Sequence, residues 1–375
     1  MEELANELHY HIAGYLPSSG LCSYRLVSKR FEEIGASTLF RTLTFHASSN
    51  SASRLEAMSQ HQQLRHAVKV LVWDTNLWDL HLAPDNIEQF ARDHYTRTAR
   101  PEYTDSWPPG IQSMFHGYQR ARKDEEAVLS KGGILSAMNM VSLLHRFPNL
   151  HEMVLINGEF SCQNEAVTRT DNKVRGHYHC LHAGKPFVRG RALHYSTRED
   201  GRPAIHAWHR LLGVNGLKRA KLRVETLSWF AFARSQMPTL GWCDTLTVLE
   251  LKINMWSYFE ENYPDERTAF KSHQLADILR GLRNLETLSL GSEDSRTFSG
   301  MLSPESRTDL GLVLPYDFIW PKMRSLTLEN VDTAEEDLLL FLGNHARTLR
   351  CLRLSNLRLI PDGDWIVLSY ECEIA

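Results

Sequence analysis

Residues 323–328 read MRSLTL and residues 349–354 read LRCLRL, and the stretch LETLSL at 285–290 has the same spacing. Each stretch has apolar side chains at its first, fourth and sixth positions. The last two of these alternate with a polar residue, which is typical of a β-strand with one buried face. The spacing therefore predicts strands, and its recurrence predicts a repeated unit.

The same spacing occurs in four further stretches, which start at Val68, Leu150, Val224 and Leu246. Amphipathic helical segments precede several of the strands, at 134–147, 274–282 and 333–343. Such alternation indicates parallel strands with helices on one face. Thr333 and Glu336 have the spacing of a capping box for the last of these helices. We therefore expect an α/β fold over residues 46–375, with long insertions at about 76–133 and 157–215.

The spacing resembles the strand segment of a leucine-rich repeat, and distances of 82, 74, 22, 39, 38 and 26 residues between first positions indicate an irregular solenoid of this kind. An ordinary α/β domain with the same leucine spacing is the alternative. In a solenoid, the residue between the last two apolar positions lies on the concave face. These residues are Val72, Val154, Ser228, Glu250, Ser289, Thr327 and Arg353. The five polar ones are candidate substrate-binding residues, although plain solvent exposure explains them equally well.

The first 45 residues predict three short helices followed by a strand at 41–45. Leu4, Leu8, Ile12 and Leu16 recur at every fourth residue, and Pro17 ends this first helix. Residues 18–20 predict a turn, and Leu21, Leu26 and Val27 a second short helix. Ser28 is the expected N-cap of a third helix over 29–37, with Phe31 and Ile34 inward. A unit of this size has a marginal core and needs a partner, either the rest of the chain or another protein.

The string RLVSKRF at 25–31, followed by Leu39 and Phe40, resembles the F-box family in order and spacing. The family usually has proline where Ala5 stands. The arrangement also resembles F-box proteins of filamentous fungi. F-boxes bind the Skp adaptor of cullin-type ubiquitin ligases through an apolar helical surface, so the resemblance implies a 1–45 adaptor-binding module. It implies adaptor-facing or supporting roles for Leu4, Leu8, Ile12, Leu16, Pro17, Leu21, Leu26, Val27 and Phe31.

The net charge of −3 conceals an uneven distribution along the chain. Residues 169–223 hold thirteen Lys or Arg and three acidic residues, a net charge of +10, and the other residues sum to −13. A local excess of positive charge favours an acidic or phosphorylated protein partner, which would be bound by arginines such as Arg189, Arg191, Arg198 and Arg202. Nucleic acid is less expected, since no RNP, KH or zinc-finger motif is present. A loop neutralised by acidic neighbours is the alternative.

The same basic stretch contains His177, His179, Cys180 and His182, with Cys162 upstream. These residue types suit zinc, but their spacing matches no known zinc finger. The sequence has no GxGxxG, GxSxG or HExxH motif and no complete phosphate loop. We therefore expect a non-catalytic protein without cofactor or metal. A metal-dependent hydrolase that uses this cluster is a less favoured alternative.

Composition indicates a globular chain, with 42% hydrophobic and 23% charged residues. No apolar run is long enough to span a bilayer, the start lacks a signal-peptide core, and the six cysteines form no CxxC pair. We expect no membrane partner and a cytoplasmic or nuclear location. The F-box resemblance implies the substrate-recognition subunit of an SCF-type (Skp–cullin–F-box) E3 ubiquitin ligase. A non-degradative, Skp-bound scaffold would have the same sequence features.

Overall fold

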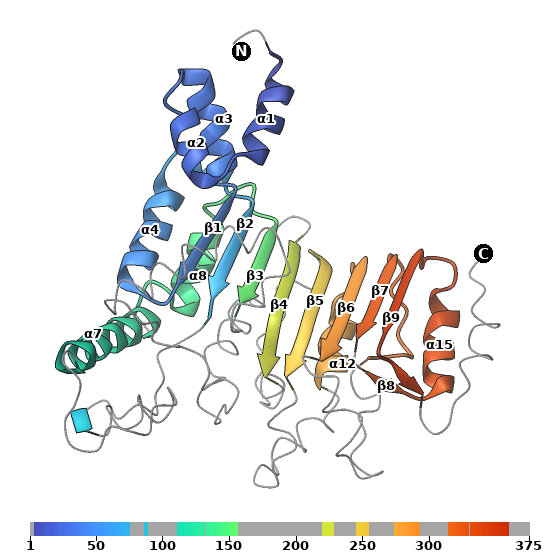
Figure 1. Ribbon diagram of the computed structural model, residues 1–375. Helices are drawn as coiled ribbons and strands as arrows, with labels where there is room; N and C mark the ends of the chain where they lie inside the picture. Colours follow the sequence, from blue (N-terminus) through green and yellow to red (C-terminus); the bar gives the residue numbers. More distant parts are fainter. Residues whose placement is uncertain are drawn as a thin grey trace, which may run out of the picture. The chain divides into compact units, whose positions relative to one another are not determined.

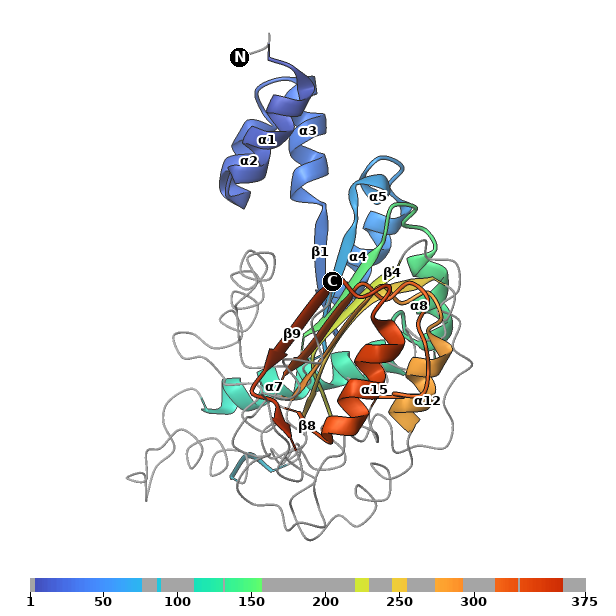
Figure 2. The ribbon, with the colours of Figure 1, turned by 90° about the vertical axis from the view of Figure 1, so that its right-hand side faces the viewer.

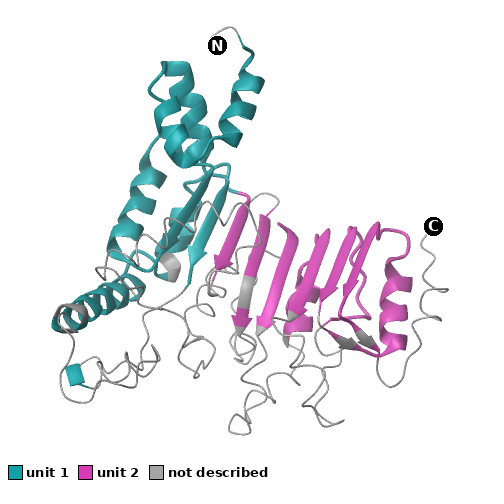
Figure 3. Cartoon of the chain, viewed as in Figure 1, with its two compact units in different colours: residues 1–150, 158–194 teal, residues 151–157, 195–375 magenta. Residues whose placement is uncertain are grey.

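The computed structural model describes residues 4–75, 86–88, 111–130, 132–156, 220–228, 245–254, 274–292, 314–329 and 331–359. The chain forms two compact units, residues 1–150 with 158–194 and residues 151–157 with 195–375 (Figure 3). The strand pairings described within each unit are parallel. The predicted α/β class with parallel strands is therefore confirmed.

The first unit begins with three helices, α1 (Asn6–Tyr15), α2 (Ser18–Tyr24) and α3 (Lys29–Leu39). Residues 18–20, predicted as a turn, form the first turn of α2 instead. Pro17 is the N-cap of α2, and its carbonyl accepts a hydrogen bond from the backbone N–H of Leu21. The N-cap prediction for α3 is confirmed, because the Ser28 hydroxyl accepts a hydrogen bond from the backbone N–H of Phe31.

Two parallel strands follow in the same unit, β1 (Thr42–His46) and β2 (Val70–Asp74), as Figure 1 shows. The helices of this unit beyond α3 are α4 (Ser49–Gln60), α5 (Leu64–Ala67), α7 (Ile111–Leu129) and α8 (Ala137–Leu144). Asp124 on α7 accepts a hydrogen bond from the backbone N–H of Ser49 at the start of α4. The prediction that Val72 lies on an exposed face is wrong. Both faces of β2 are covered, so Val72 is buried together with Leu71 and Trp73.

The second unit contains a parallel sheet with the strand order β3-β4-β5-β6-β7-β9 (Figure 1). Its strands are β3 (Glu152–Ile156), β4 (Ala220–Ser228), β5 (Leu246–Asn254), β6 (Thr287–Ser292), β7 (Ser325–Glu329) and β9 (Cys351–Ser355). The predicted leucine positions coincide across the strands, since Leu249, Leu288 and Leu326 are paired and buried. The apolar face of this sheet is therefore continuous.

A second parallel pair consists of β8 (Asp332–Thr333) and β10 (Arg358–Leu359). Ser325 pairs with Cys351 and Asp332 pairs with Arg358, so the same 26-residue offset relates β7 to β9 and β8 to β10. This offset equals the predicted distance between the last two copies of the apolar spacing. The last part of the described chain therefore repeats a strand–short strand unit.

Helices α12 (Gln274–Gly281) and α15 (Glu335–His345) lie on the same face of this sheet (Figure 2). The predicted capping box of α15 is wrong, because Thr333 belongs to β8 and Ala334 is an N-cap without a side-chain hydrogen bond. Pairing with β10 keeps Thr333 extended. The negative charges of the first turn of α15 still complement the positive end of the helix.

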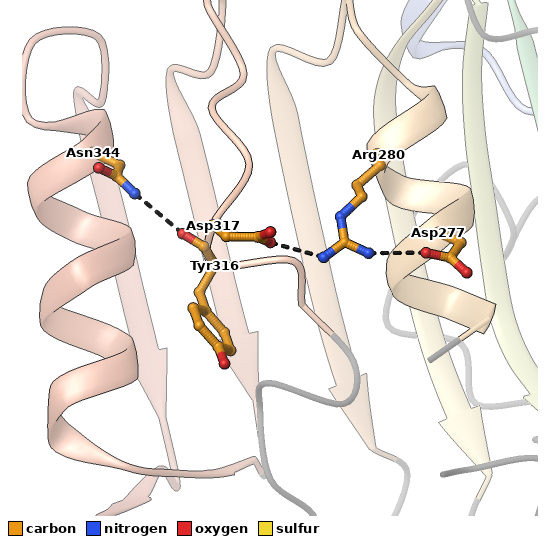
Figure 4. A network of polar contacts seen from close by, with 5 residues as sticks. All are labelled: Asp277, Arg280, Tyr316, Asp317 and Asn344. Carbon is orange, nitrogen blue, oxygen red and sulfur yellow. Dashed lines mark hydrogen bonds and ion pairs between the residues drawn. The ribbon is translucent and has the colours of Figure 1, made fainter. Parts of the chain in front are cut away.

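The segment between β6 and β7 is held between these two helices (Figure 4). The Arg280 guanidinium on α12 contacts Asp277 and Asp317, each at 2.8 Å. Asn344 on α15 donates a hydrogen bond to the backbone carbonyl of Tyr316 at 3.1 Å. Hydrogen bonding to Arg280 lowers the pKa of Asp317. Arg280 is thus neutralised by two carboxylates, and its ion pair with Asp317 links α12 to the segment between β6 and β7.

Candidate functional site

The three N-terminal helices share a small core. Ala13, Leu21, Tyr24, Phe31 and Ile34 form a buried cluster, and Leu16 and Leu39 pack against it. These residues come from all three helices, so each helix contributes to one packed unit. The core fixes which side chains of the helices face outward.

A buried histidine completes this core. The Nδ1 atom of His9 is hydrogen-bonded to the Tyr24 hydroxyl at 2.9 Å, and its ring meets the edge of Phe31 at 4.8 Å between centroids. Burial raises the pKa of Tyr24, and the nearby Arg30 cation opposes this rise. Arg30 also donates hydrogen bonds to the Asn6 side chain at 2.8 Å and to the Leu4 carbonyl at 2.6 Å. These contacts tie the start of α1 to α3.

The outer surface of the helices is apolar in two places. Along α1, Leu8, Ile12 and Tyr15 are 49%, 37% and 83% exposed and lie on one stripe, since they are four and three residues apart. Between α2 and α3, Leu26 and Val27 are 87% and 62% exposed. We call these five residues the apolar docking surface.

The predicted adaptor residues divide into two groups in the structure. Five of them are exposed: Leu8, Ile12, Pro17, Leu26 and Val27. Leu4 and Leu16 are partly buried, and Leu21 and Phe31 belong to the core. The core residues can support an interface only indirectly. Tyr15 was missed as a surface residue, although its position three residues after Ile12 places it on the same stripe.

The predicted substrate-binding row is largely present on the sheet of the second unit. Strand register aligns Glu250, Ser289, Thr327 and Arg353 on four neighbouring strands. Arg353 is exposed and the other three are partly exposed. Val154 has the aligned position on β3, but it is buried, so its predicted exposure is wrong.

Ser228 does not belong to this row. It pairs with Asn254 at the far end of β5, whereas Arg223 pairs with Glu250 and occupies the predicted position on β4. The inward residues of β4 beside Arg223 are Leu222 and Val224. The apolar spacing missed this register because the position three residues before Leu222 is an arginine, Arg219, rather than an apolar residue.

Five charged side chains on this face are paired across strands. The Nε atom of Arg223 lies 3.1 Å from Glu152 on β3 and 3.2 Å from Glu250 on β5, and it forms ion pairs without a well-aligned hydrogen bond. Lys252 on β5 reaches Glu329 on β7 at 3.5 Å. The intervening strand carries Gly291 at this position, so no side chain stands between the two charges.

Replacing Arg223 with methionine is expected to lower the free energy of unfolding by about 1 kcal/mol, because Glu152 and Glu250 then lose their shared cation and repel each other. Urea unfolding followed by circular dichroism measures the change. Lys221→Met on the same strand is the matched control, since Lys221 has no ion pair among the described residues. Equal stability of the two variants would contradict a role for the Arg223 ion pairs.

Other predicted sites lie outside the described residues. These are Arg189, Arg191, Arg198 and Arg202 of the basic stretch and the cluster of His177, His179, Cys180 and His182 with Cys162. Within the described part of the chain, no group of three His, Cys, Asp or Glu residues is placed to hold a metal ion. The described helices also include none with the length and apolarity needed to cross a membrane.

No protein-family model matches the chain, and no curated protein matches it significantly.

Proposed function

We propose that this protein is the substrate-recognition subunit of an SCF-type E3 ubiquitin ligase. Its N-terminal helices form an F-box that binds the Skp adaptor, and its strand–helix region is a leucine-rich-repeat-like module that holds a protein substrate. The chain itself carries out no chemistry. It would place a lysine of the substrate near the charged conjugating enzyme, so that catalysis results from proximity.

The apolar docking surface is the observation that carries this proposal. Leu26 and Val27 are exposed on a helical unit with a core of only a few side chains. Clustered exposed apolar residues of this kind mark surfaces that a partner covers. The F-box resemblance, carried by residues 25–31, identifies the Skp adaptor as that partner, and a cytoplasmic or nuclear location fits such a complex.

The repeated strand units support the second part of the proposal. Parallel strands with helices on one face leave the other face of the sheet for a partner. In the second unit, this other face contains the row from Arg223 to Arg353. Its mixture of paired charges and small hydroxyl side chains suits contact with a polar protein surface.

Co-expression of the full chain with the Skp adaptor tests the proposed function. We expect the two proteins to co-purify as a stoichiometric complex and to elute together in size-exclusion chromatography. Addition of the cullin, the RING subunit and conjugating enzymes should then give ubiquitination of a bound substrate, or of the chain itself. Separate elution of chain and adaptor at micromolar concentration would refute the F-box assignment.

A further inference from the structure

An edge of the second unit carries five exposed cationic side chains. Arg324 and Arg350 immediately precede β7 and β9, and the links that lead to β6, β7 and β9 contribute the remaining three. The five residues, which we call the basic edge, are Arg283, Lys322, Arg324, Arg347 and Arg350. The one acidic residue in these links, 282–286, 320–324 and 346–350, is the partly buried Glu286.

Backbone hydrogen bonds show that the two strand-start arginines are neighbours. The N–H of Arg350 donates to the carbonyl of Arg324, and the N–H of Arg324 donates to the carbonyl of Glu286, both at 2.8 Å. Residues 286, 324 and 350 therefore form one row at the beginning of three adjacent strands. Like charges in such neighbouring positions repel and lower stability.

Structural reasons explain only part of the basic edge. Arg283 and Arg347 each lie two residues beyond the end of α12 or α15, where a cation complements the negative helix end. Arg324 and Arg350 stand at the start of strands rather than at the end of a helix. Their side chains also have no ion pair among the described residues.

Two other arginines of the same unit are neutralised by carboxylates. Arg280 is held between Asp277 and Asp317 (Figure 4), and Arg223 lies between Glu152 and Glu250. The basic edge differs because, within the described residues, Lys322 alone has a side-chain partner, the neutral amide of Asn284. Among the described residues of this unit, most cations without a carboxylate partner therefore lie in these three links, although Lys221 and Arg353 also lack one.

We propose that the basic edge binds an anionic segment of a protein partner, with carboxylates or phosphates facing Arg324 and Arg350. This inference rests on the proposed function and specifies the chemical class of the substrate. Arginine suits this task because its guanidinium forms paired hydrogen bonds with either anion. Three adjacent strands cover about 10 Å, which is the length of roughly three residues of extended peptide.

A peptide fits this edge better than a nucleic acid. Proteins that bind single-stranded nucleic acid combine cations with aromatic side chains on which bases stack. The three links contain a single aromatic residue, Trp320, and it is fully buried. A short run of two or three anionic side chains therefore matches the size and chemistry of the basic edge.

Fluorescence anisotropy with the purified full chain, in the absence of adaptor, tests the proposal. The probes are fluorescein-labelled octaglutamate, the matched octaglutamine and a peptide of the same length that contains phosphoserine. We expect octaglutamate but not octaglutamine to bind, and Arg324→Glu/Arg350→Glu to weaken this binding roughly tenfold or more. A stronger preference for phosphoserine or for glutamate would identify which anion the edge prefers.

The matched control is Arg54→Glu/Lys69→Glu, which makes the same charge change at exposed residues of the first unit. It should alter octaglutamate affinity less than twofold, roughly, because it makes the same change in net charge and leaves the basic edge intact. Equal losses in both double variants, or unchanged affinity in the edge variant, would overturn the proposal. Tighter binding of an octathymidylate through the same arginines would also overturn it. Because no adaptor is present, these results are independent of the F-box assignment.

Discussion

Replacing Leu26 and Val27 together with aspartate is expected to abolish binding of the Skp adaptor and to leave the N-terminal helices folded. Both side chains are mostly exposed, and neither belongs to the core of the helices. In a complex, burying each would contribute about 1.5–3 kcal/mol, whereas a buried aspartate would be an unpaired charge. Binding should weaken at least about a hundredfold in isothermal titration calorimetry with recombinant adaptor.

Two controls separate loss of the surface from loss of the fold. Gln62→Asp/Gln63→Asp adds the same charge at exposed residues outside the three helices and should leave both affinity and helical content unchanged. Phe31→Ala empties the core and should cost about 3–5 kcal/mol, so adaptor binding and helical content fall together. Full affinity in the Leu26/Val27 variant would show that this part of the surface does not bind the adaptor.

Local signals in the sequence were enough to predict three helices, but not their orientation or the bounds of the second. Leu26 and Val27, predicted as part of the second helix, follow its end at Tyr24. Ser28 has the chemistry of an N-cap, and Pro17 marks the boundary between the first two helices. A four-residue recurrence advances by about 40° around a helix at each step, so the predicted stripe curves across the surface. In the structure, two members of this stripe, Leu8 and Ile12, face outward. The inward positions are held by Ala13 and by His9, whose polar ring is buried because Tyr24 supplies a hydrogen bond.

The repeated apolar spacing was enough to predict where strands form, but not how neighbouring strands align. Leu285, Met323 and Leu349 each begin a stretch that forms a strand, and all three are buried. The copy predicted at Val224 has the wrong register, because the copy of the spacing that aligns with β5 begins with the charged Arg219, and this alignment became visible only from backbone pairing. The basic edge was missed for the same reason, since Arg324 and Arg350 are 26 residues apart in sequence and adjacent only in the sheet.

The protein is also expected to lose stability in mild acid through His345. This buried imidazole has two backbone partners, at 2.8 Å from Nδ1 to the Phe341 carbonyl and at 3.0 Å from Nε2 to the Trp320 N–H. A carbonyl can only accept and an N–H can only donate, so the ring must be neutral with its proton on Nδ1. Burial accordingly lowers the pKa of His345, with the Phe341 hydrogen bond opposing part of the shift.

The direction of the pH effect follows from the two states of this histidine. Above about pH 6.5 the imidazole is neutral in both the folded and the unfolded chain, and its contribution to stability is fully present. Below that pH the unfolded chain takes up a proton that the folded chain does not. The free energy of unfolding should therefore fall by up to about 1.4 kcal/mol for each pH unit, until the lowered pKa of the folded state is reached.

Urea unfolding between pH 7.5 and pH 5, followed by circular dichroism, measures this loss. His345→Gln should be less stable than the natural chain at pH 7.5, because the stacked ring contacts with Phe341 are lost, and it should lose less stability in acid. His66→Gln removes an exposed histidine and should keep the full acid dependence. An unchanged acid dependence in His345→Gln would mean that a group other than His345 takes up the proton on unfolding. That result would contradict the prediction, because an imidazole whose two nitrogens are bound to Trp320 and Phe341 must resist protonation in the folded chain.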